Sequence, residues 1–376
     1  MGKITVLGAG RVGNAMIRDL STRFSILACD RDQQALEKLK DVANVNSKQV
    51  DIQKLDLSGL LQGSDLVISA VPGFMGYETL ERIIRCGKNV VDISFFPEDP
   101  LNLDLLAKEN KVTAVVDCGV APGMGNIILG RYNEAFQIDS YECLVGGLPV
   151  KREWPYQYKA VFSPIDVIEE YIRPARFIKG GKMITREALS DPELVEFDET
   201  GTLESFNTDG LRTLMTTMDI PDMIEKTMRY PGTIDYLKVL RETGFFSYDP
   251  VKIDNKEIRP IDLTAKLLFP IWKQENGDAD ITVMRITMKG IAGGKRTEIT
   301  YNLYDTYDFE RDISSMARTT GYTCTAVASL IMDQKYEQPG INPPEFLGRK
   351  AADYAYILNY LKDRKVIYQK EEKVIL

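Results

Sequence analysis

The sequence predicts an α/β protein in which a Rossmann doubly wound parallel sheet is joined to a second α+β domain with an open, mainly antiparallel sheet. Three observations lead to this fold class. Short apolar strands alternate with amphipathic helices from the start of the chain, a glycine-rich turn follows the first strand, and a long alternating segment later folds back at a Gly-Gly pair.

The first domain begins with the strand KITVLG and the helix RVGNAMIRDLSTRF. Val12, Ala15, Met16 and Leu20 share one face of that helix, as in a helix that packs on a sheet. Further strands are expected at SILACD, DLVISAVP, NVVDISF and KVTAVVDCG, and further helices at QQALEKLK, YETLERIIRCG and LNLDLLAKEN. Buried strands that alternate with helices indicate a parallel sheet covered on both faces.

The turn GAGRVG lies between the first strand and its helix. Gly8 permits a tight turn, Gly10 lets the backbone approach a pyrophosphate, and Gly13 lets helix and strand pack closely. The helix N-terminus then faces the phosphates. The motif alone is a weak signal, but here it has the correct flanks, and Asp30 ends the second strand. We therefore expect a dinucleotide site, and a purely structural glycine turn is the alternative.

Three further motifs, SAVPGFMG, DISF and VDCG, end strands at the sheet edge where dinucleotides bind, and SAVPGFMG is expected to form a sharp loop. A carboxylate at Asp30 accepts hydrogen bonds from the ribose hydroxyls and repels a 2′-phosphate, so it favours NAD. Arg31 beside it keeps NADP open as the second choice. The expected cofactor-binding residues are Gly8, Gly10, Arg11, Val12, Gly13, Asp30, Arg31, Asp51, Ala70, Val71, Pro72 and Ile93.

The pattern changes near residue 126, where a helix GNIILGRYNEAF leads to the strand SYECLVGGLP. ITVMRITMKGIAGGKRTEITYNLY reads as a long antiparallel hairpin. Two closing helices, DISSMARTTGYTCTAVASLIMD and PPEFLGRKAADYAYILNYLKDRKV, are expected to return to the first domain. The expected domains are 1–125, completed by 312–376, for the nucleotide, and 126–311 for substrate binding and dimerisation.

The composition limits the possible chemistry. The chain of 376 residues has a formal net charge of -8 and no basic stripe, so we expect no nucleic-acid partner. It has no histidine, which excludes Ser-His-Asp and Cys-His catalysis and His-ligated metals, and we expect no metal. Five scattered cysteines, no signal-peptide pattern and no apolar run of about 18 residues predict a cytoplasmic protein without a membrane partner.

Three stretches of the second domain are rich in functional groups: FNTDGLRTL with Arg212, RYPGT with Arg229 and Tyr230, and YKAVFSP with Lys159. Arginines beside glycine-containing turns suit the bidentate capture of a carboxylate. The alternative for each arginine is a salt bridge with the excess acidic residues.

Taken in order, GAGRVG, SAVPG, DCGVAPGMGN, VGGLP, FNTDGLRTL, RYPGT and MARTTGY resemble the saccharopine dehydrogenase family along nearly the whole chain, and most closely its compact branch with lysine 6-dehydrogenases. The resemblance implies a Rossmann domain completed by C-terminal helices, a homodimer, and chemistry at the C–N bond of lysine or a lysine-derived amino acid. It implies substrate contacts at Ser94, Phe95, Asp117, Arg212, Arg229 and Tyr230. The chain departs from the pattern at Thr233, where relatives often have histidine.

The stretch VVDCGVAPGMGN then gains a functional interpretation. Asp117 is expected to pair with the substrate ammonium and to stabilise the iminium that forms when hydride leaves. Its alternative is a hinge residue that caps the next helix. Tyr230, Lys159 and Cys118 are candidates for the proton transfers, and the sequence does not rank them.

The function expected from this resemblance is NAD-dependent L-lysine 6-dehydrogenase activity. Glutamate-forming saccharopine dehydrogenase is the first alternative, and the presence of both Arg212 and Arg229 supports it, because saccharopine has more carboxylates than lysine. A carboxynorspermidine-type dehydrogenase comes next. A non-catalytic NAD-binding regulator is the last alternative, since it would not need the second-domain motifs.

Overall fold

The computed structural model describes residues 1–275 and 277–375. These form two compact units. Unit 1 comprises Met1–Gln137, Arg212–Thr217 and Met316–Ile367, and unit 2 comprises Ile138–Leu211, Met218–Ser315 and Tyr368–Leu376.

Unit 1 is built on a parallel sheet of seven strands in the order β17-β6-β5-β4-β1-β2-β3. Strands one to six therefore have the 3-2-1-4-5-6 order of a dinucleotide-binding Rossmann fold, which confirms the predicted fold class. The strands are β1 Lys3–Leu7, β2 Ser25–Asp30, β3 Val45–Gln49, β4 Leu66–Ser69, β5 Asn89–Asp92, β6 Thr113–Val115 and β17 Gly340–Asn342.

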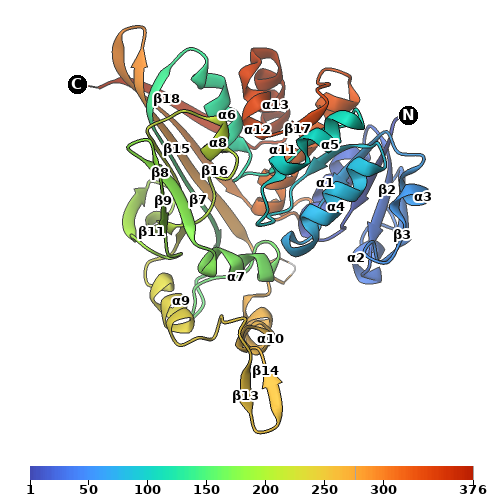
Figure 1. The fold of residues 1–376 in the computed structure, drawn as a ribbon, viewed down its shortest axis with the longest axis horizontal. Coiled ribbons are helices and arrows are strands. Elements are labelled where there is room, and N and C mark those ends of the chain that lie inside the picture. The colour runs from blue at the N-terminus through green and yellow to red at the C-terminus, as the bar shows by residue number, and fades with distance from the viewer. Residues whose placement is uncertain (276, 376) are drawn as a thin grey trace. The chain divides into compact units, whose positions relative to one another are not determined.

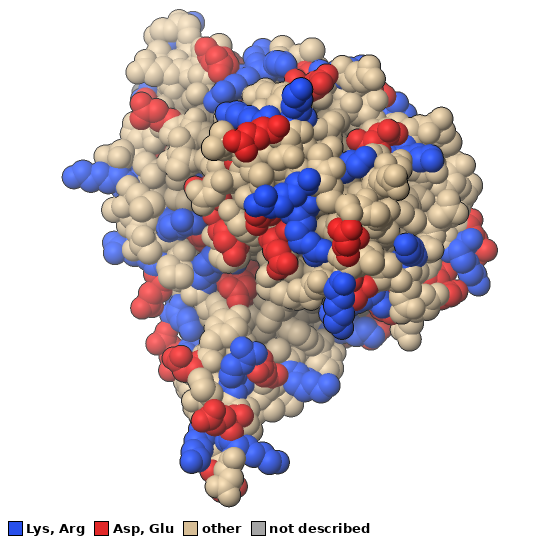
Figure 2. All heavy atoms as spheres, turned by 45° about the vertical axis from the view of Figure 1, so that its right-hand side comes forward, with Lys and Arg blue, Asp and Glu red and all other residues tan. Residues whose placement is uncertain are grey.

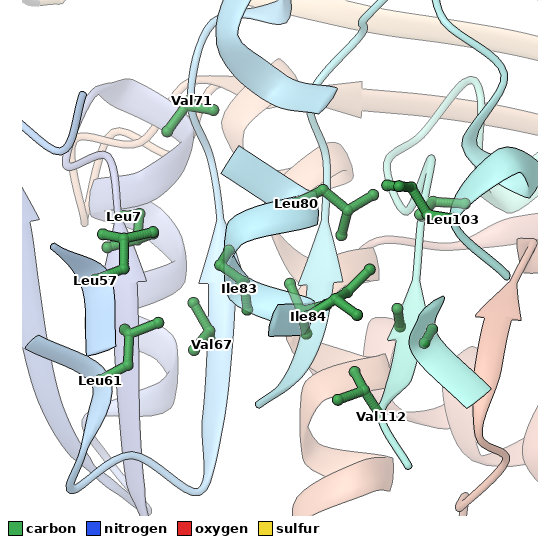
Figure 3. Close-up of a cluster of buried hydrophobic side chains, with 14 of the residues drawn as sticks. Leu7, Leu57, Leu61, Val67, Val71, Leu80, Ile83, Ile84, Leu103 and Val112 are labelled. Atoms are coloured by element: carbon green, nitrogen blue, oxygen red, sulfur yellow. The ribbon is translucent and has the colours of Figure 1, made fainter. Parts of the chain in front are cut away.

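Unit 1 also contains helices, several of which lie against this sheet (Figure 1). The helices of unit 1 are α1 Arg11–Leu20, α2 Gln33–Glu37, α3 Leu57–Leu61, α4 Gly73–Arg85, the 3₁₀ helix Pro100–Leu103, α5 Asp104–Glu109, α6 Met124–Asn133, α8 Leu214–Thr217, α11 Ser315–Met332, α12 Pro344–Arg349 and α13 Ala351–Asp363. Figure 3 shows one core cluster, in which Ile83 of α4 lies beside Val67 and Leu80 of α4 points toward Leu103. These side chains are buried, so their packing fixes α4 against the strands that end at the candidate site.

Two expected elements differ in unit 1. The loop expected at SAVPGFMG is largely the first turn of α4, because Pro72 is the extended N-cap residue and Gly73 already begins the helix. The expected single closing helix is two helices, α12 and α13, because Lys350 has an extended backbone with φ -87 and ψ 118. Gly348 also packs so closely on α6 that a Cβ there would lie 2.0 Å from the Ile127 carbonyl oxygen.

Unit 2 is built on a mainly antiparallel sheet of nine strands with the main order β10-β11-β12-β7-β15-β16-β18, to which β8 and β9 are attached beside β12. Strand β12 pairs with β7 in parallel, whereas its pairings with β8 and β11, and those of β8 with β9, β10 with β11, β15 with β16 and β16 with β18, are antiparallel. The nine strands of this sheet are β7 Gln137–Pro149, β8 Ala175–Lys179, β9 Lys182–Arg186, β10 Glu193–Phe197, β11 Gly201–Asn207, β12 Asp222–Arg229, β15 Asp280–Ala292, β16 Lys295–Thr306 and β18 Tyr368–Val374. Strands β13 Val251–Ile253 and β14 Lys256–Ile258 form a separate sheet of two strands. The helices of unit 2 are α7 Pro164–Ile172, α9 Thr233–Glu242 and α10 Pro260–Trp272.

The long hairpin expected from the alternating segment is β15 and β16. Its turn residues Gly293 and Gly294 have φ angles of +56° and +78°, the left-handed values that a two-residue turn of this kind requires.

The unit boundaries differ from the expected ranges in four segments. Residues 312–315, which were expected in the first domain, belong to unit 2. Helix α6 belongs to unit 1, where it packs against α12, and the short segment Arg212–Thr217 also belongs to unit 1. The end of the chain belongs to unit 2, because β18 pairs with β16.

Figure 2 shows Lys and Arg side chains interspersed with Asp and Glu. Across the described residues, none of the helices is both long and apolar enough to cross a lipid bilayer.

Candidate active site

The glycine-rich loop leaves open space at only one of its three motif glycines. A Cβ at Gly8, whose φ is +104°, would lie 2.3 Å from the Ala70 carbonyl oxygen, and one at Gly13 would lie 2.1 Å from the Gly8 carbonyl oxygen. At Gly10 no atom lies within 4 Å of the added Cβ. Gly10 is also the N-cap of α1, whose first turn holds no acidic residue. The loop therefore fits a phosphate that approaches Gly10 and the helix N-terminus.

Asp30 ends β2 and is bound to the loop. One carboxylate oxygen accepts a hydrogen bond from the Ala9 amide at 2.7 Å, and the other accepts one from the Asp32 amide at 2.8 Å. The side chain thus fixes the glycine loop as well as facing the region where a ribose is expected. Arg31 beside it is exposed, and Asp51 forms an ion pair with Lys54 at 3.2 Å.

The ends of β4 and β5 carry the next expected cofactor residues. Ile93 follows β5, and its amide donates to the Ser69 carbonyl at the end of β4 at 3.0 Å. Ala70, Val71 and Pro72 follow β4 and lead into α4. All twelve expected cofactor residues except Asp51 therefore lie in or beside the glycine loop and the carboxyl ends of β2, β4 and β5.

A buried carboxyl group at Asp92 ends β5. Its carboxylate accepts hydrogen bonds from the amide of Ser94 at 2.9 Å and from the hydroxyl of Ser94 at 3.1 Å. Burial, with a smaller contribution from the charge of Asp117, raises the pKa of Asp92 to about 7 against the opposing hydrogen bonds. Asp92 is therefore the group of this strand edge that titrates near neutral pH, in a chain without histidine.

Asp117 follows β6 and forms a buried ion pair with Arg212. The guanidinium Nε lies 3.0 Å from both carboxylate oxygens, and Nη2 lies 2.9 Å from Oδ1. The two side chains are 0% and 3% exposed. Both residues have a left-handed backbone, with φ +51° at Asp117 and +50° at Arg212, which is uncommon for residues other than glycine. Such strain persists only where the surrounding structure fixes it, and it occurs often at functional sites.

The aromatic turn after β5 completes the surroundings of Arg212. Its Nη1 donates to the Phe96 carbonyl, and its guanidinium carbon lies 5.2 Å from the ring centres of both Phe95 and Phe96. Ser94 and Asp92 hold the start of the same turn.

The segment that carries Arg212 is anchored by Glu345, which is 0% exposed. Thr217 donates to one carboxylate oxygen at 2.5 Å, and Asn126 donates to the other at 3.1 Å. Asn126 in turn accepts from the Gly123 amide at 3.1 Å, at the start of α6. Burial raises the pKa of Glu345. This network holds Arg212–Thr217 on unit 1 from both α6 and α12.

Cys118 is placed poorly for moving protons. It is 0% exposed, and burial raises the pKa of its thiol, with the charges of Asp92 and Asp117 acting in the same direction. The thiol is therefore neutral at pH 7 and a weak base.

The remaining expected residues, Arg229, Tyr230 and Lys159, belong to unit 2. Arg229 is buried, donates to the Tyr171 hydroxyl at 3.1 Å and to Glu170 at 2.8 Å, and lies 4.4 Å from the Tyr158 ring centre. These contacts satisfy its charge and its hydrogen bonds within unit 2.

Tyr230 and Lys159 also have partners in unit 2. The Tyr230 hydroxyl donates to the Pro149 carbonyl at 2.8 Å, its ring lies 3.8 Å from the Arg152 guanidinium carbon, and burial raises its pKa. Lys159 lies 3.3 Å from Glu153.

Two protein-family models match most of the chain. The model of the saccharopine dehydrogenase NADP binding domain matches residues 4–115, and the model of the saccharopine dehydrogenase C-terminal domain matches residues 119–367. The chain belongs to the saccharopine dehydrogenase family. This confirms the resemblance recognised in the sequence, and it agrees with the glycine loop of unit 1 in indicating a nicotinamide dinucleotide as cofactor.

Individual relatives in this family are distant. The chain is 26% identical over 194 residues to the mitochondrial alpha-aminoadipic semialdehyde synthase of Mus musculus. The matched region is 48% of this chain but only 21% of the synthase. It is 23% identical to "Saccharopine dehydrogenase [NADP(+), L-glutamate-forming]" of Saccharomyces cerevisiae, with 100% of both chains covered. The solved apo structure of that yeast enzyme covers 100% of both chains with a TM-score of 0.79 and 18% identity, and so shares the fold.

The expected site residues can now be compared with their positions in the structure. The structure brings Asp117, Arg212, Ser94 and Phe95 together in unit 1 and leaves Arg229, Tyr230 and Lys159 in unit 2. It adds Asp92, whose strand-end motif DISF was visible but whose raised pKa depends on burial. It also adds Glu345, for which the sequence gave no signal, because PPEF reads as the start of an ordinary helix.

Proposed function

We propose that the protein is a nicotinamide-dependent oxidoreductase that makes or breaks the C–N bond of saccharopine, and that it releases L-glutamate in the oxidative direction. The support is the full-length similarity to the yeast protein of that name together with the match of the N-terminal family model. Lysine 6-dehydrogenase activity, expected from the sequence, has less support among the relatives and becomes the second candidate.

The observation that carries the proposal is the Asp117–Arg212 pair. An amino-acid group has a positively charged nitrogen and a negatively charged carboxylate. In the substrate complex, Asp117 would bind the nitrogen and Arg212 would bind the carboxylate, in place of their contact with each other. Asp117 would then hold the nitrogen at which the iminium forms, and Arg212 would hold a carboxylate through its planar guanidinium. The strained backbone at both residues supports a functional role over a simple surface salt bridge.

In the proposed oxidation, the carbon beside the substrate nitrogen loses hydride, water adds to the resulting C=N bond, and the C–N bond then breaks to leave an aldehyde and an amine. The nicotinamide cofactor, when bound, supplies the hydride acceptor. Gly8, Gly10 and Gly13 would hold its phosphates, and Asp30 and Arg31 would flank its ribose. Asp92, whose pKa is about 7, is placed to influence the protonation state of the site.

For the cofactor we propose NADP rather than the NAD expected from the sequence. The relatives' names and the N-terminal family model support NADP. Two features of the loop agree with it. Both carboxylate oxygens of Asp30 already accept backbone hydrogen bonds, which offsets part of the repulsion toward a 2′-phosphate, and Arg31 is exposed next to them.

The test follows the formation of the reduced cofactor by its absorbance, and measures glutamate and ammonia as products. Saccharopine and L-lysine are supplied separately, each with NADP⁺ and with NAD⁺. We expect turnover of saccharopine with release of glutamate. Asp117→Asn and Arg212→Lys should lower kcat/KM at least about 100-fold while cofactor affinity stays near wild type, because neither residue is part of the glycine loop. The matched control Asp363→Asn, at the exposed end of α13, should keep full activity. Full activity of both site variants would contradict the proposal.

The second candidate, oxidative ε-deamination of lysine, is favoured by one observation. Arg229 is internally paired with Glu170 and Tyr171, so only Arg212 remains as a candidate for a substrate carboxylate among the two predicted arginines. One arginine suffices for lysine, which has a single carboxylate. Release of ammonia from lysine, with no glutamate from saccharopine, would select this candidate.

A further inference from the structure

The connection between β7 and α7 carries an excess of positive charge in an acidic protein. Its residues 151–159, which we call the cationic loop, hold three cationic side chains, Lys151, Arg152 and Lys159, but only one acidic side chain, Glu153. The whole chain, in contrast, has a formal net charge of -8. A local excess of positive charge attracts anionic ligands, so the cationic loop is a candidate place for one.

Arg152 differs from the two lysines of this loop in its partners. Glu153 lies 2.6 Å from the Lys151 ammonium and 3.3 Å from the Lys159 ammonium, so the two lysines share this carboxylate. Within the described part of the chain, Arg152 forms no ion pair, and its guanidinium carbon lies 3.8 Å from the centre of the Tyr230 ring. Arg152 is exposed, and a guanidinium that lies on an aromatic face still binds a carboxylate through two parallel N–H groups.

The place of Arg152 is fixed by the segment that carries Tyr230. The Tyr230 ring is 4% exposed, and its hydroxyl donates to the carbonyl of Pro149, directly before the loop, at 2.8 Å. Farther along the loop, the Tyr156 carbonyl accepts a hydrogen bond from the Thr233 hydroxyl at 3.0 Å. Arg152 lies between these two anchors and rests on a ring that is itself held. A side chain that is restrained before binding loses less conformational entropy when the ligand arrives.

The charge of the loop bears on the choice between the two candidate substrates. Saccharopine has more carboxylates than amines and is a net anion at pH 7, as is the glutamate it releases, whereas lysine is a net cation. Arg229 is enclosed by Glu170 and Tyr171 and has its charge satisfied there. Arg152 has no such acidic partner within the described residues, so it is the better cation of unit 2 for a substrate carboxylate.

We propose that Arg152 is a specificity-determining residue that binds a carboxylate of saccharopine and favours this substrate over lysine. This inference rests on the proposed function and names a further residue of that site. Arg152 acts on binding alone, because a guanidinium stays protonated near neutral pH and takes no part in proton or hydride transfer.

Steady-state kinetics of the full-length protein give the first test. Arg152→Ala should raise the KM for saccharopine at least about tenfold and leave kcat within about twofold, because the lost contact is equally strong before and during the reaction. Arg152→Lys keeps the charge but loses the planar pair of donors, so it should recover only part of the affinity. The matched control Lys151→Ala removes the same charge from the neighbouring position and should raise KM less than about threefold, since that exposed ammonium is already paired and is screened by salt.

The alternative role of Arg152 is purely structural, as a cover for the Tyr230 ring. Loss of this cover would lower the temperature of thermal unfolding and leave the KM for saccharopine unchanged. That result for Arg152→Ala would overturn the proposal, as would an equal change of KM in Arg152→Ala and Lys151→Ala.

Trp154 allows binding to be measured without turnover. It is 82% exposed and two positions from Arg152, whereas Trp272, the second of the two tryptophans, is 0% exposed. Saccharopine and L-lysine are titrated separately with NADPH present, because NADPH cannot accept a hydride from saccharopine. Tryptophan fluorescence is recorded, and Trp154→Phe identifies the contribution of this side chain. We expect saccharopine to change the Trp154 emission, and Arg152→Ala to weaken the apparent affinity at least about tenfold.

The two measurements separate this inference from the proposed function. Turnover of saccharopine with unchanged KM and affinity in Arg152→Ala would refute the role of Arg152 alone. Binding of saccharopine that depends on Arg152, without turnover, would support the role of Arg152 and refute the proposed function. Neither binding nor turnover of saccharopine would refute both, and an equal loss of affinity for lysine would refute the role in specificity.

Discussion

The carboxylate of Asp117 and the guanidinium of Arg212 form a buried ion pair although 95 positions separate them in the chain. Asp117 follows strand β6 of the parallel sheet. Arg212 lies on a six-residue segment that interrupts the sequence of unit 2 and belongs to unit 1. Removal of one member leaves a buried charge without its partner. The pair therefore contributes to both folding and the proposed chemistry.

Asp117→Ala should destabilise the protein by about 3–5 kcal/mol, the cost of leaving a buried guanidinium unpaired. The double variant Asp117→Ala, Arg212→Ala should be less destabilised than the sum of the two single variants. Urea unfolding of all four proteins at pH 7 measures this coupling. A coupling near zero would mean that the pair does not exist in solution.

The glycine loop allows a sharper distinction between folding and cofactor binding. Gly10→Ala should fold as the wild type does, since the added Cβ meets no atom within 4 Å, but it should weaken dinucleotide affinity at least about tenfold by filling the place of a phosphate. Gly13→Ala should instead lower stability, because its Cβ would lie 2.1 Å from the Gly8 carbonyl oxygen.

Isothermal titration with NADPH and thermal unfolding, measured side by side, check both expectations for the glycine loop. Normal cofactor affinity of Gly10→Ala would contradict the assignment of the loop.

The sequence predicted the Rossmann sheet and the long hairpin because each depends on a local pattern, and the site residues stay a prediction. It could not predict that Arg212 and Arg229 differ in role. Both are arginines beside a glycine turn, but Arg229 is enclosed by Glu170 and aromatic rings, and Arg212 faces Asp117. Glu345 was missed for the same reason, since its partners Thr217 and Asn126 come from distant parts of the chain. Long-range polar pairing decides these roles, and periodicity carries no information about it.

Asp92 should make stability depend on pH. Its pKa is raised from 3.8 to about 7 in the folded protein, so the folded chain retains a proton that the unfolded chain loses between these pH values. The free energy of unfolding should therefore fall as pH rises through this window, by up to about 4 kcal/mol from this group. Asp92→Asn should lack this contribution, while the exposed control Asp363→Asn should follow the wild type. Urea unfolding between pH 5 and pH 8 measures the slopes, and equal slopes for wild type and Asp92→Asn would refute the raised pKa.

Cofactor preference should depend on Arg31 more than on Asp30. Arg31→Ala should raise the KM for NADPH about tenfold or more and leave the KM for NADH nearly unchanged, because the exposed guanidinium would lose only the 2′-phosphate. Asp30→Asn should weaken both cofactors, since Asp30 holds the Ala9 amide of the loop at 2.7 Å. The control is Lys40→Ala, an exposed cation in the turn that follows α2. If Arg31→Ala changes neither KM while Asp30→Asn improves NADPH alone, then Asp30 discriminates against NADP, and the preference for NAD expected from the sequence is correct.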